Sequence, residues 1–476
     1  IAVDGKITDG ETVIDESLVT GESMPVAKKP GDRVIGGSVN QTGAIRFKAT
    51  EVGSDTVLAH IIALVERAQN SKAPGQRIAD KAAAVLVVVA VGSGVLTLFG
   101  WFFFGNVPLI TALTFAISAV VIACPDALGL ATPTAVAVGT GLGAKRHILI
   151  KDAATLENAS KINAIVLDKT GTLTEGKPKV IQVIAAVGFT EDDVLRYEAS
   201  LEQGSNHPLA KAILDEAEKR GIANAVRAEK FSSIAGHGIK GVIGGKTVFA
   251  GTERLLKSNQ IDIEPIRDAA LALSRTGATL SFLSVDGKVA GVIGAADAVK
   301  PSAKKAIQAF NDMGIEPAMI TGDHKAVAEA VGKELGIKRI FSEVLPEDKA
   351  RYVKQLQDEG KFVAMVGDGI NDAPALAQAN IGIAIGSGTD VAIETGSIVL
   401  MQSDPYDIVA AIRLSKATVR KMKQNLFWAA IYNILAIPVA AGVFYPTFGI
   451  SLRPEIAALL MSVSSIIVAT NAVLLK

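Results

Sequence analysis

The 476-residue sequence predicts a multidomain membrane protein. We expect an α-helical transmembrane bundle, an α/β doubly wound domain, an inserted α+β domain and a partial β-rich domain. Three observations predict this fold class: long apolar stretches fall in two pairs, strand-like and helical patterns alternate between the pairs, and hydrophobic residues make up 49% of the chain. The 48 Lys and Arg residues balance 48 Asp and Glu residues, so no nucleic-acid partner is indicated.

The first 55 residues are rich in Gly, Val and Thr, in a pattern of short strands and turns. The chain starts at Ile1, without an initiating Met or a signal peptide, inside what we interpret as a β-rich domain. We therefore expect a fragment of a longer protein. Within this region the stretch Thr20-Gly21-Glu22-Ser23 predicts an exposed turn between strands.

The two apolar pairs predict four membrane spans. The first pair covers residues 82–104 and 109–142, and the second covers residues 426–446 and 455–475. Basic clusters follow the first pair and precede the second. This charge pattern predicts that the polar blocks share the cytoplasmic side of the membrane.

The second span contains Cys124-Pro125-Asp126, and Cys124 is the single cysteine of the chain. An ionisable group at this depth is costly and indicates a functional site. Pro125 is expected to kink the helix and to free backbone carbonyls beside the thiol, which is an arrangement that suits a metal ligand. The alternative is a buried apolar cysteine beside an aspartate that reaches the membrane surface.

Between the apolar pairs, strand-like runs end at Asp168, at Thr321-Gly322-Asp323 and at Gly367-Asp368. Helical patterns alternate with these runs, which predicts a doubly wound parallel sheet. Residues 180–285 interrupt the alternation with helices and a Gly-rich strand set of their own. We interpret them as an inserted domain.

Open α/β sheets place their active sites at the carboxyl ends of the strands, where Asp168 is expected to lie. A carboxylate at this position can attack a phosphoryl group and form an acyl phosphate. Asp368 and Asp372 follow a second buried run and offer the hard oxygen ligands that Mg²⁺ prefers. The alternative for each of these residues is a solvated aspartate in a turn.

The stretch Asp168-Lys169-Thr170-Gly171-Thr172 resembles the phosphorylation signature of P-type ATPases, and the resemblance extends over essentially the whole chain. It is strongest to the heavy-metal branch and, within that branch, to the copper(I) exporters. The resemblance implies a haloacid-dehalogenase-like phosphorylation domain, a nucleotide-binding domain and an actuator domain. The implied boundaries are 1–55 for the partial actuator domain, 56–150 and 416–476 for the transmembrane hairpins, 151–179 and 288–415 for the phosphorylation domain, and 180–287 for the nucleotide-binding domain.

The resemblance also implies the roles of individual residues. Asp168 is the nucleophile, and Glu22 positions the water that hydrolyses the aspartyl phosphate. The remaining assignments are Lys349, Thr321 and Asp323 around the phosphoryl group, Asp368 and Asp372 at Mg²⁺, Glu202, His207, Gly236, Gly238 and Thr170 at ATP, Asp297 in a hinge motif, and Cys124, Asp126, Tyr432, Asn433, Met461 and Ser465 at the transported metal.

The implied protein is a multi-pass pump in the plasma membrane whose soluble domains are cytoplasmic. Its cofactors are ATP and Mg²⁺, and its partners are the lipid bilayer, the transported ion and a soluble metallochaperone as metal donor. Three departures from the family pattern are visible: Asn206 stands where Glu is common, Thr252 where Asn is common, and Asp126 where a second Cys is expected.

Several alternatives remain at this stage. Met461 is a soft ligand suited to copper(I), whereas Asp126 is hard and favours a divalent ion such as Cu²⁺, Zn²⁺ or Co²⁺. Soluble phosphatases of the same superfamily have a second Asp two residues after the nucleophile. Here that residue is Thr170, so the phosphoenzyme should persist. A metal sensor or channel would not need the phosphorylation residues, and an alkali or alkaline-earth pump would need an oxygen-rich membrane site.

Overall fold

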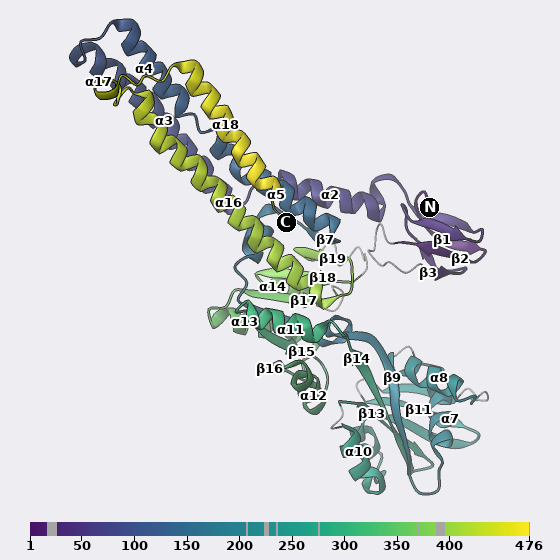
Figure 1. Cartoon of the computed structure of the whole chain (residues 1–476). Coiled ribbons are helices and arrows are strands. Elements are labelled where there is room, and N and C mark those ends of the chain that lie inside the picture. The colour runs from purple at the N-terminus through teal and green to yellow at the C-terminus, as the bar shows by residue number, and fades with distance from the viewer. Residues whose placement is uncertain are drawn as a thin grey trace. The chain divides into compact units, whose positions relative to one another are not determined.

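The computed structural model describes residues 1–16, 26–205, 208–222, 228–234, 237–274, 277–368, 372–386 and 396–475. By its internal contacts the chain divides into two compact units. The first comprises residues 1–162, 380–402 and 407–476, and the second comprises residues 163–379 and 403–406. Each unit is described below by itself (Figure 1).

The first unit begins with two small antiparallel sheets, of strand order β4-β1-β6 and β3-β2-β5. Asp4 ties this β-rich part to the helix that follows it, because its buried carboxylate accepts hydrogen bonds from the backbone N–H groups of Gly36 and Val57. The strands are β1 (Asp4–Asp9), β2 (Thr12–Asp15), β3 (Val26–Lys28), β4 (Arg33–Val34), β5 (Val39–Thr42) and β6 (Arg46–Glu51).

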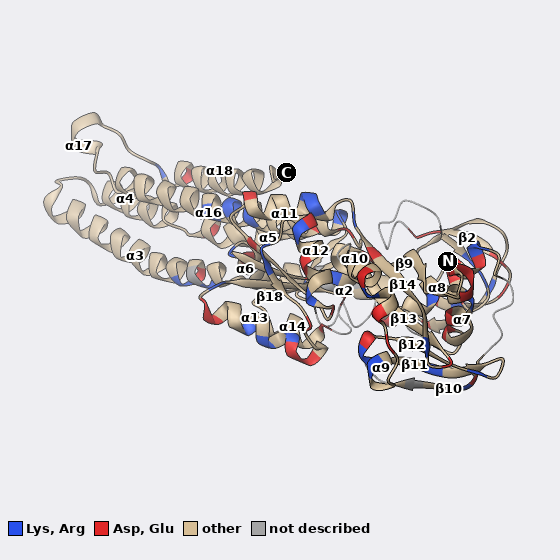
Figure 2. Ribbon diagram, turned by 90° about the horizontal axis from the view of Figure 1, so that it is seen from below, with Lys and Arg blue, Asp and Glu red and all other residues tan. Residues whose placement is uncertain are grey.

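Long helices form the rest of the first unit, together with three short strands of order β18-β19-β7. In Figure 1 the helices α3, α4, α16 and α18 run alongside one another as a bundle, and Figure 2 shows that long stretches of α3 and α4 carry no charged residue. The elements are α2 (Val57–Asn70), α3 (Pro74–Phe104), α4 (Leu109–Ile122), α5 (Asp126–Lys145), β7 (Ile148–Ile150), α6 (Ala153–Ala159), β18 (Ile381–Ile385), β19 (Ile398–Leu400), α16 (Pro405–Ala440), α17 (Tyr445–Phe448) and α18 (Pro454–Val473).

Within the described residues, three helical stretches are long and apolar enough to cross a membrane. They are Ala79–Phe104, Leu109–Lys145 and Pro454–Val473, and they agree with three of the four predicted spans. The prediction of a span at residues 426–446 is not matched in the same way. Helix α16 begins far earlier, in a polar and basic segment, and ends at Ala440, so its apolar part is short.

The second unit contains a parallel sheet of strand order β16-β15-β8-β17, flanked by helices. The predicted strands before Asp168, Thr321 and Asp368 are all present, because each is a short run of buried apolar residues. The elements are β8 (Ala164–Asp168), α11 (Ala303–Asp312), β15 (Glu316–Ile320), α12 (Lys325–Leu335), β16 (Arg339–Phe341), α13 (Lys349–Asp358), β17 (Val363–Gly367) and α14 (Ala373–Gln378).

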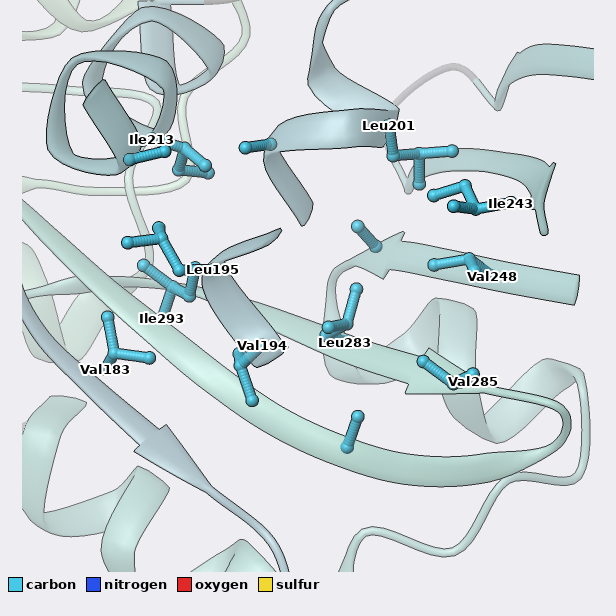
Figure 3. Packing of buried hydrophobic residues seen from close by; sticks show 14 of the residues in the cluster. Val183, Val194, Leu195, Leu201, Ile213, Ile243, Val248, Leu283, Val285 and Ile293 are labelled. Atoms are coloured by element: carbon cyan, nitrogen blue, oxygen red, sulfur yellow. The ribbon is translucent and has the colours of Figure 1, made fainter. Parts of the chain in front are cut away.

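The inserted part of the second unit is a six-stranded antiparallel sheet of order β10-β11-β12-β13-β14-β9. Helices α7 and α8 pack on one face of this sheet, and Figure 3 shows α7 residues Leu195 and Leu201 among sheet residues such as Ile293 and Val248. The elements are β9 (Thr174–Ala185), α7 (Glu191–Glu202), α8 (Pro208–Lys219), β10 (Glu229–Ile234), β11 (Gly238–Ile243), β12 (Lys246–Gly251), α9 (Glu253–Ser258), α10 (Arg267–Ser274), β13 (Thr279–Val285) and β14 (Lys288–Val299).

Candidate active site

Asp168 is the last residue of β8, the strand that lies between β15 and β17 in the parallel sheet. In the register of the sheet, Asp168 pairs with Ile320, and Thr321 is therefore the next residue at the same edge. On the other side Val366 pairs with Leu167, so Gly367 and Asp368 follow at this edge. The sheet thus brings together the three strand ends that the sequence predicted to form the site.

The chain turns sharply after Asp168, through a single wide helical turn at Lys169–Leu173. Gly171 has a φ of +73°, which is a conformation that favours glycine. The ammonium group of Lys300 donates a hydrogen bond of 2.6 Å to the carbonyl of Gly171 and another of 2.6 Å to the carbonyl of Ser403. Burial lowers the pKa of Lys300. This lysine therefore supports the turn that presents the nucleophile.

Lys349 is the first residue of α13, and it places a buried cation between two carboxylates. Its Nζ lies 2.7 Å from Oδ1 of Asp168 and 2.6 Å from Oδ1 of Asp372. Asp372 has only 1% of its side chain exposed. Burial disfavours the charge of Lys349, but the two carboxylates outweigh this effect and raise its pKa, so the ammonium stays charged.

Burial is the main reason why the pKa of Asp168 rises from 3.8 to about 6. The negative charge of Asp372 raises it further, Lys349 lowers it, and Asp368 adds a smaller rise. Asp168 is therefore mostly ionised at neutral pH, and it is a more basic carboxylate than a solvated aspartate. This combination suits a nucleophile that attacks a phosphoryl group.

The loop after β15 faces the same edge of the sheet. Thr321 is buried, and its hydroxyl accepts a hydrogen bond of 3.1 Å from the backbone N–H of Asp323. The carboxylate of Asp323 pairs with the ammonium group of Lys169, the residue that follows the nucleophile. An ion pair therefore joins the loop after β15 to the segment that follows the nucleophile.

The donors at this edge of the sheet fit Mg²⁺. Among the described residues no three His, Cys, Asp or Glu side chains converge closely enough to hold a metal ion by themselves. Mg²⁺ needs fewer, because it binds one or two carboxylates together with substrate phosphates and waters. Asp168 and Asp368 supply two carboxylates whose charges act on each other. Asp372 is engaged with Lys349, which donates a hydrogen bond to its Oδ1.

Two of the residues predicted to hold the nucleotide belong to the described part of the inserted domain: Gly238 in β11 and Glu202 on α7. Gly238 opens β11 with a φ of +144° and pairs with Gly251 at the end of β12. The carbonyl of His237 accepts hydrogen bonds from the backbone and the hydroxyl of Thr252, which also caps α9. Glu202, the last residue of α7, is buried, and burial raises the pKa of its carboxyl group. Thr170, by contrast, is exposed beside the nucleophile.

The Cys124-Pro125-Asp126 motif breaks the second predicted span, as expected. Helix α4 ends at Ile122 and α5 begins at Asp126, so Cys124 lies in the short link between them. The hydroxyl of Ser465 on α18 donates a hydrogen bond of 3.1 Å to Oδ2 of Asp126. The second proline of this span, Pro133, lies inside α5 and does not end the helix.

Two apolar clusters flank this link and bring α16 and α18 to it. Tyr432 packs with Ile122 and Ala457 on one side, while Ala429 and Val468 pack with Ala127 on the other. Asn433 follows Tyr432 on α16, and Met461 and Ser465 lie between Ala457 and Val468 along α18. Among the described residues the buried hydroxyl of Tyr432 has no hydrogen-bond partner. The six predicted metal ligands thus belong to one region of the bundle.

Three predicted site residues lie outside the described residues: Glu22, His207 and Gly236. Sequence reasoning also missed two features of the site. One is the hydrogen bond from Lys300 to the nucleophile turn, and the other is the pairing of Lys169 with Asp323. Lys300 lies three residues after Asp297, the residue assigned to a hinge motif, so this motif could have indicated a role for Lys300. Nothing in the sequence indicates a partner for Lys169.

A family model for haloacid dehalogenase-like hydrolases matches residues 162–380, the part of the chain that contains Asp168 and the parallel strands around it. A second family model, for the P-type ATPase actuator domain, matches residues 1–66. A solved zinc-transporting PIB-type ATPase in the E2.Pi state is 31% identical, with a TM-score of 0.71 over 99% of this chain and 76% of that one. The chain therefore belongs to the heavy-metal (PIB-type) branch of the P-type ATPases.

Curated relatives are similar along the whole chain. The copper-transporting ATPase 1 of Rhizobium meliloti is 46% identical over 477 residues, which cover 100% of this chain and 58% of the relative. The copper-exporting P-type ATPase of Legionella pneumophila is also 46% identical, with 64% of its length covered. The chain thus spans about three fifths of the length of the relatives that it matches.

Proposed function

We propose that this chain forms the catalytic and transport core of an ATP-driven heavy-metal pump that works through an aspartyl phosphate on Asp168. The observation that carries the proposal is the buried clamp in which Lys349 holds Asp168 and Asp372 at 2.7 Å and 2.6 Å. A nucleophile, a fixed cation and neighbouring acidic ligands are the parts that phosphoryl transfer requires.

In the proposed reaction an oxygen of Asp168 forms a bond to the γ-phosphorus of ATP, while the bond to the bridging β,γ-oxygen breaks and ADP leaves. Lys349 offsets the negative charge that gathers on the transferred group, and Thr321 lies at the same sheet edge as a further contact. Mg²⁺, bound by Asp168 and Asp368, supplies charge neutralisation on the phosphate oxygens when present.

The resulting phosphoenzyme is expected to persist. The position two residues after Asp168 holds Thr170, which cannot act as a general acid for hydrolysis at neutral pH. Hydrolysis then waits for Glu22, which we assign to the water-positioning role. A durable intermediate suits a transport cycle, because its free energy can drive the rearrangement of the membrane helices.

We propose copper(I) as the cargo, held by Cys124, Tyr432, Asn433, Met461, Ser465 and Asp126. The similarity along the whole of this chain to proteins named as copper transporters supports this choice. A divalent ion is the second candidate, because the hard carboxylate of Asp126 lies at the helix break with Ser465 as its hydrogen-bond partner. We further propose that the pump lies in the plasma membrane with its soluble parts in the cytoplasm, and that a metallochaperone delivers the ion.

The test is metal-stimulated ATP hydrolysis in membranes that contain the protein, across Cu⁺, Cu²⁺, Zn²⁺ and Co²⁺. Asp168→Asn serves as the inactive control, and Asp126→Cys is measured alongside. Stimulation by Cu⁺ that depends on Asp168 supports the copper(I) proposal. Stimulation by a divalent ion alone, changing to Cu⁺ in Asp126→Cys, would overturn copper(I) in favour of a divalent pump. Hydrolysis that ignores every metal would overturn both.

A further inference from the structure

Glu198 is a fully buried carboxyl group in the inserted domain, and none of the roles above uses it. Its side chain is 0% exposed, and neither of its carboxyl oxygens has a hydrogen-bond partner among the described residues. A buried carboxylate without partners is strongly disfavoured, whereas the neutral acid is tolerated far better. The group therefore needs an explanation beyond packing.

The surroundings of Glu198 are those of a helix–sheet core. Val194 and Leu195 on α7 pack against β13 and β14, and Leu201 lies beside Ile243 of β11, as Figure 3 shows. Helix α7 sits so close to the sheet that a Cβ at Gly291 would touch Val194. The other apolar residues of this core come from α7 itself and from β9, α8, β11, β12, β13 and β14: Ala199, Val183, Ile213, Ala217, Ile239, Ile243, Val248, Ala250, Leu283, Val285, Ala290 and Ile293.

Two polar groups act on Glu198 in this core. Ser281 of β13 is its polar neighbour on the sheet, and Glu202 lies one helical turn further along α7, on the same face of the helix. The cations around this helix are engaged elsewhere: Lys246 contacts the ring and hydroxyl of Tyr197, Arg196 pairs with Asp193, and Arg220 pairs with Glu191. Burial raises the pKa of Glu198 to about 8, an effect that Ser281 partly offsets and that the charge of Glu202 slightly increases.

Glu198 also lies next to the end of the sheet that we assign to the nucleotide. Ser281 precedes Phe282, which pairs with Gly251, and Gly251 pairs in turn with Gly238. Glu202 ends the same helix, four residues after Glu198. The carboxyl group thus stands between the core of the domain and the residues expected to contact ATP.

We infer that Glu198 is a positioning residue that must stay protonated, so that α7 seats against β13 and holds Glu202 in place for the nucleotide. The inference rests on the proposed ATP-binding role of this domain. Ionisation of Glu198 places an unpaired negative charge in the core and beside Glu202, which favours release of the end of α7 from the sheet. ATP affinity should then fall with pH while the phosphorylation site stays intact.

The test is the apparent KM for ATP, together with binding of trinitrophenyl-ATP, between pH 6.5 and pH 9 for the whole protein. If only the protonated form binds, KM at pH 9 should be about tenfold above its value at pH 7, because the competent fraction falls to about one tenth. Glu198→Gln keeps the shape without the charge, so its KM should stay within about twofold over this range. Glu218→Gln, an exposed acid on α8, should keep the wild-type rise.

An equal rise of KM in wild-type protein and Glu198→Gln would overturn the inference, and so would a flat wild-type profile. Hydrogen exchange of the wild-type protein gives a second measurement that needs no variant. Amides at the end of α7 should lose protection above pH 8 while those of β14 keep theirs, and equal loss in both would contradict the inference. Failure of the proposed pump function looks different, because nucleotide binding would persist without any phosphoenzyme.

Discussion

Replacing Lys349 by Met tests the clamp around the nucleophile. The ammonium lies within 2.7 Å of two buried carboxylates, Asp168 and Asp372. Breaking one side of such a buried pair costs about 3–5 kcal/mol. In the variant, protonation of Asp168 removes the unpaired buried charge and can recover about 3 kcal/mol of this cost. Because one pKa unit corresponds to about 1.4 kcal/mol, the pKa of Asp168 should rise by about two units.

The expected result is a shift in the pH dependence of phosphorylation. The attacking form of Asp168 is the carboxylate, so the rate should fall as pH drops through the pKa of this residue. With a pKa of about 6, wild-type Asp168 is about 90% ionised at pH 7. In Lys349→Met the midpoint should move to about pH 8, which leaves about 10% ionised at pH 7 and slows phosphorylation about tenfold.

The assay is the initial rate of phosphoenzyme formation from radiolabelled ATP between pH 5 and pH 9. Lys354→Met is the matched control, because Lys354 lies on the same helix but forms an exposed pair with Asp358. The control should keep the wild-type midpoint near pH 6. If the midpoint of the pH dependence stays near pH 6 in Lys349→Met, whatever the absolute rate of phosphorylation, the reasoning about the clamp is refuted.

Three further changes test neighbouring parts of the account. Thr170→Asp supplies the missing acid, so the half-life of the phosphoenzyme in a cold chase should shorten about 100-fold; an unchanged half-life would contradict this role of the position. Gly238 has a φ of +144°, and Gly238→Ala would place a methyl group against the carbonyl oxygen of Ala250. The resulting strain should raise the KM for ATP about tenfold or more. An unaltered KM would argue against a nucleotide at this edge of the sheet. Asp297 accepts a 2.5 Å hydrogen bond from the hydroxyl of Thr174 and two more from the backbone N–H groups of Gly176 and Lys177. Asp297→Ala should therefore reduce the free energy of unfolding by about 1 kcal/mol per bond and speed hydrogen exchange at residues 174–177. Unchanged exchange at these residues would count against a hinge.

The parts of the fold that repeat a local pattern could be predicted from the sequence. The strands before Asp168, Thr321 and Asp368 are short buried apolar runs, and their parallel pairing brings these three residues to one edge. The break at Pro125 follows from its missing N–H donor. Each of these features depends on residues that are close in sequence, apart from the pairing itself.

The rest depends on long-range contacts that no local pattern encodes. Lys349 contacts Asp168, which lies 181 positions earlier in the sequence. Lys349 also donates a hydrogen bond to Asp372, so this aspartate binds the ammonium group instead of facing solvent. Strand β9 alternates poorly between buried and exposed residues, and its partner β14 comes about a hundred residues later in the sequence. The sequence pattern alone suggests that Glu198 is an ordinary polar residue of an amphipathic helix, whereas the structure shows that its side chain is fully buried.

The central claim is that Asp168 receives the γ-phosphate of ATP when the transported metal binds. The most direct measurement is phosphoenzyme formation in membranes containing the protein, with and without Cu⁺, followed by hydroxylamine, which cleaves acyl phosphates. The account predicts a metal-dependent, hydroxylamine-sensitive phosphoenzyme that is absent in Asp168→Asn. A phosphoenzyme that survives in Asp168→Asn, or none under any metal, would contradict it.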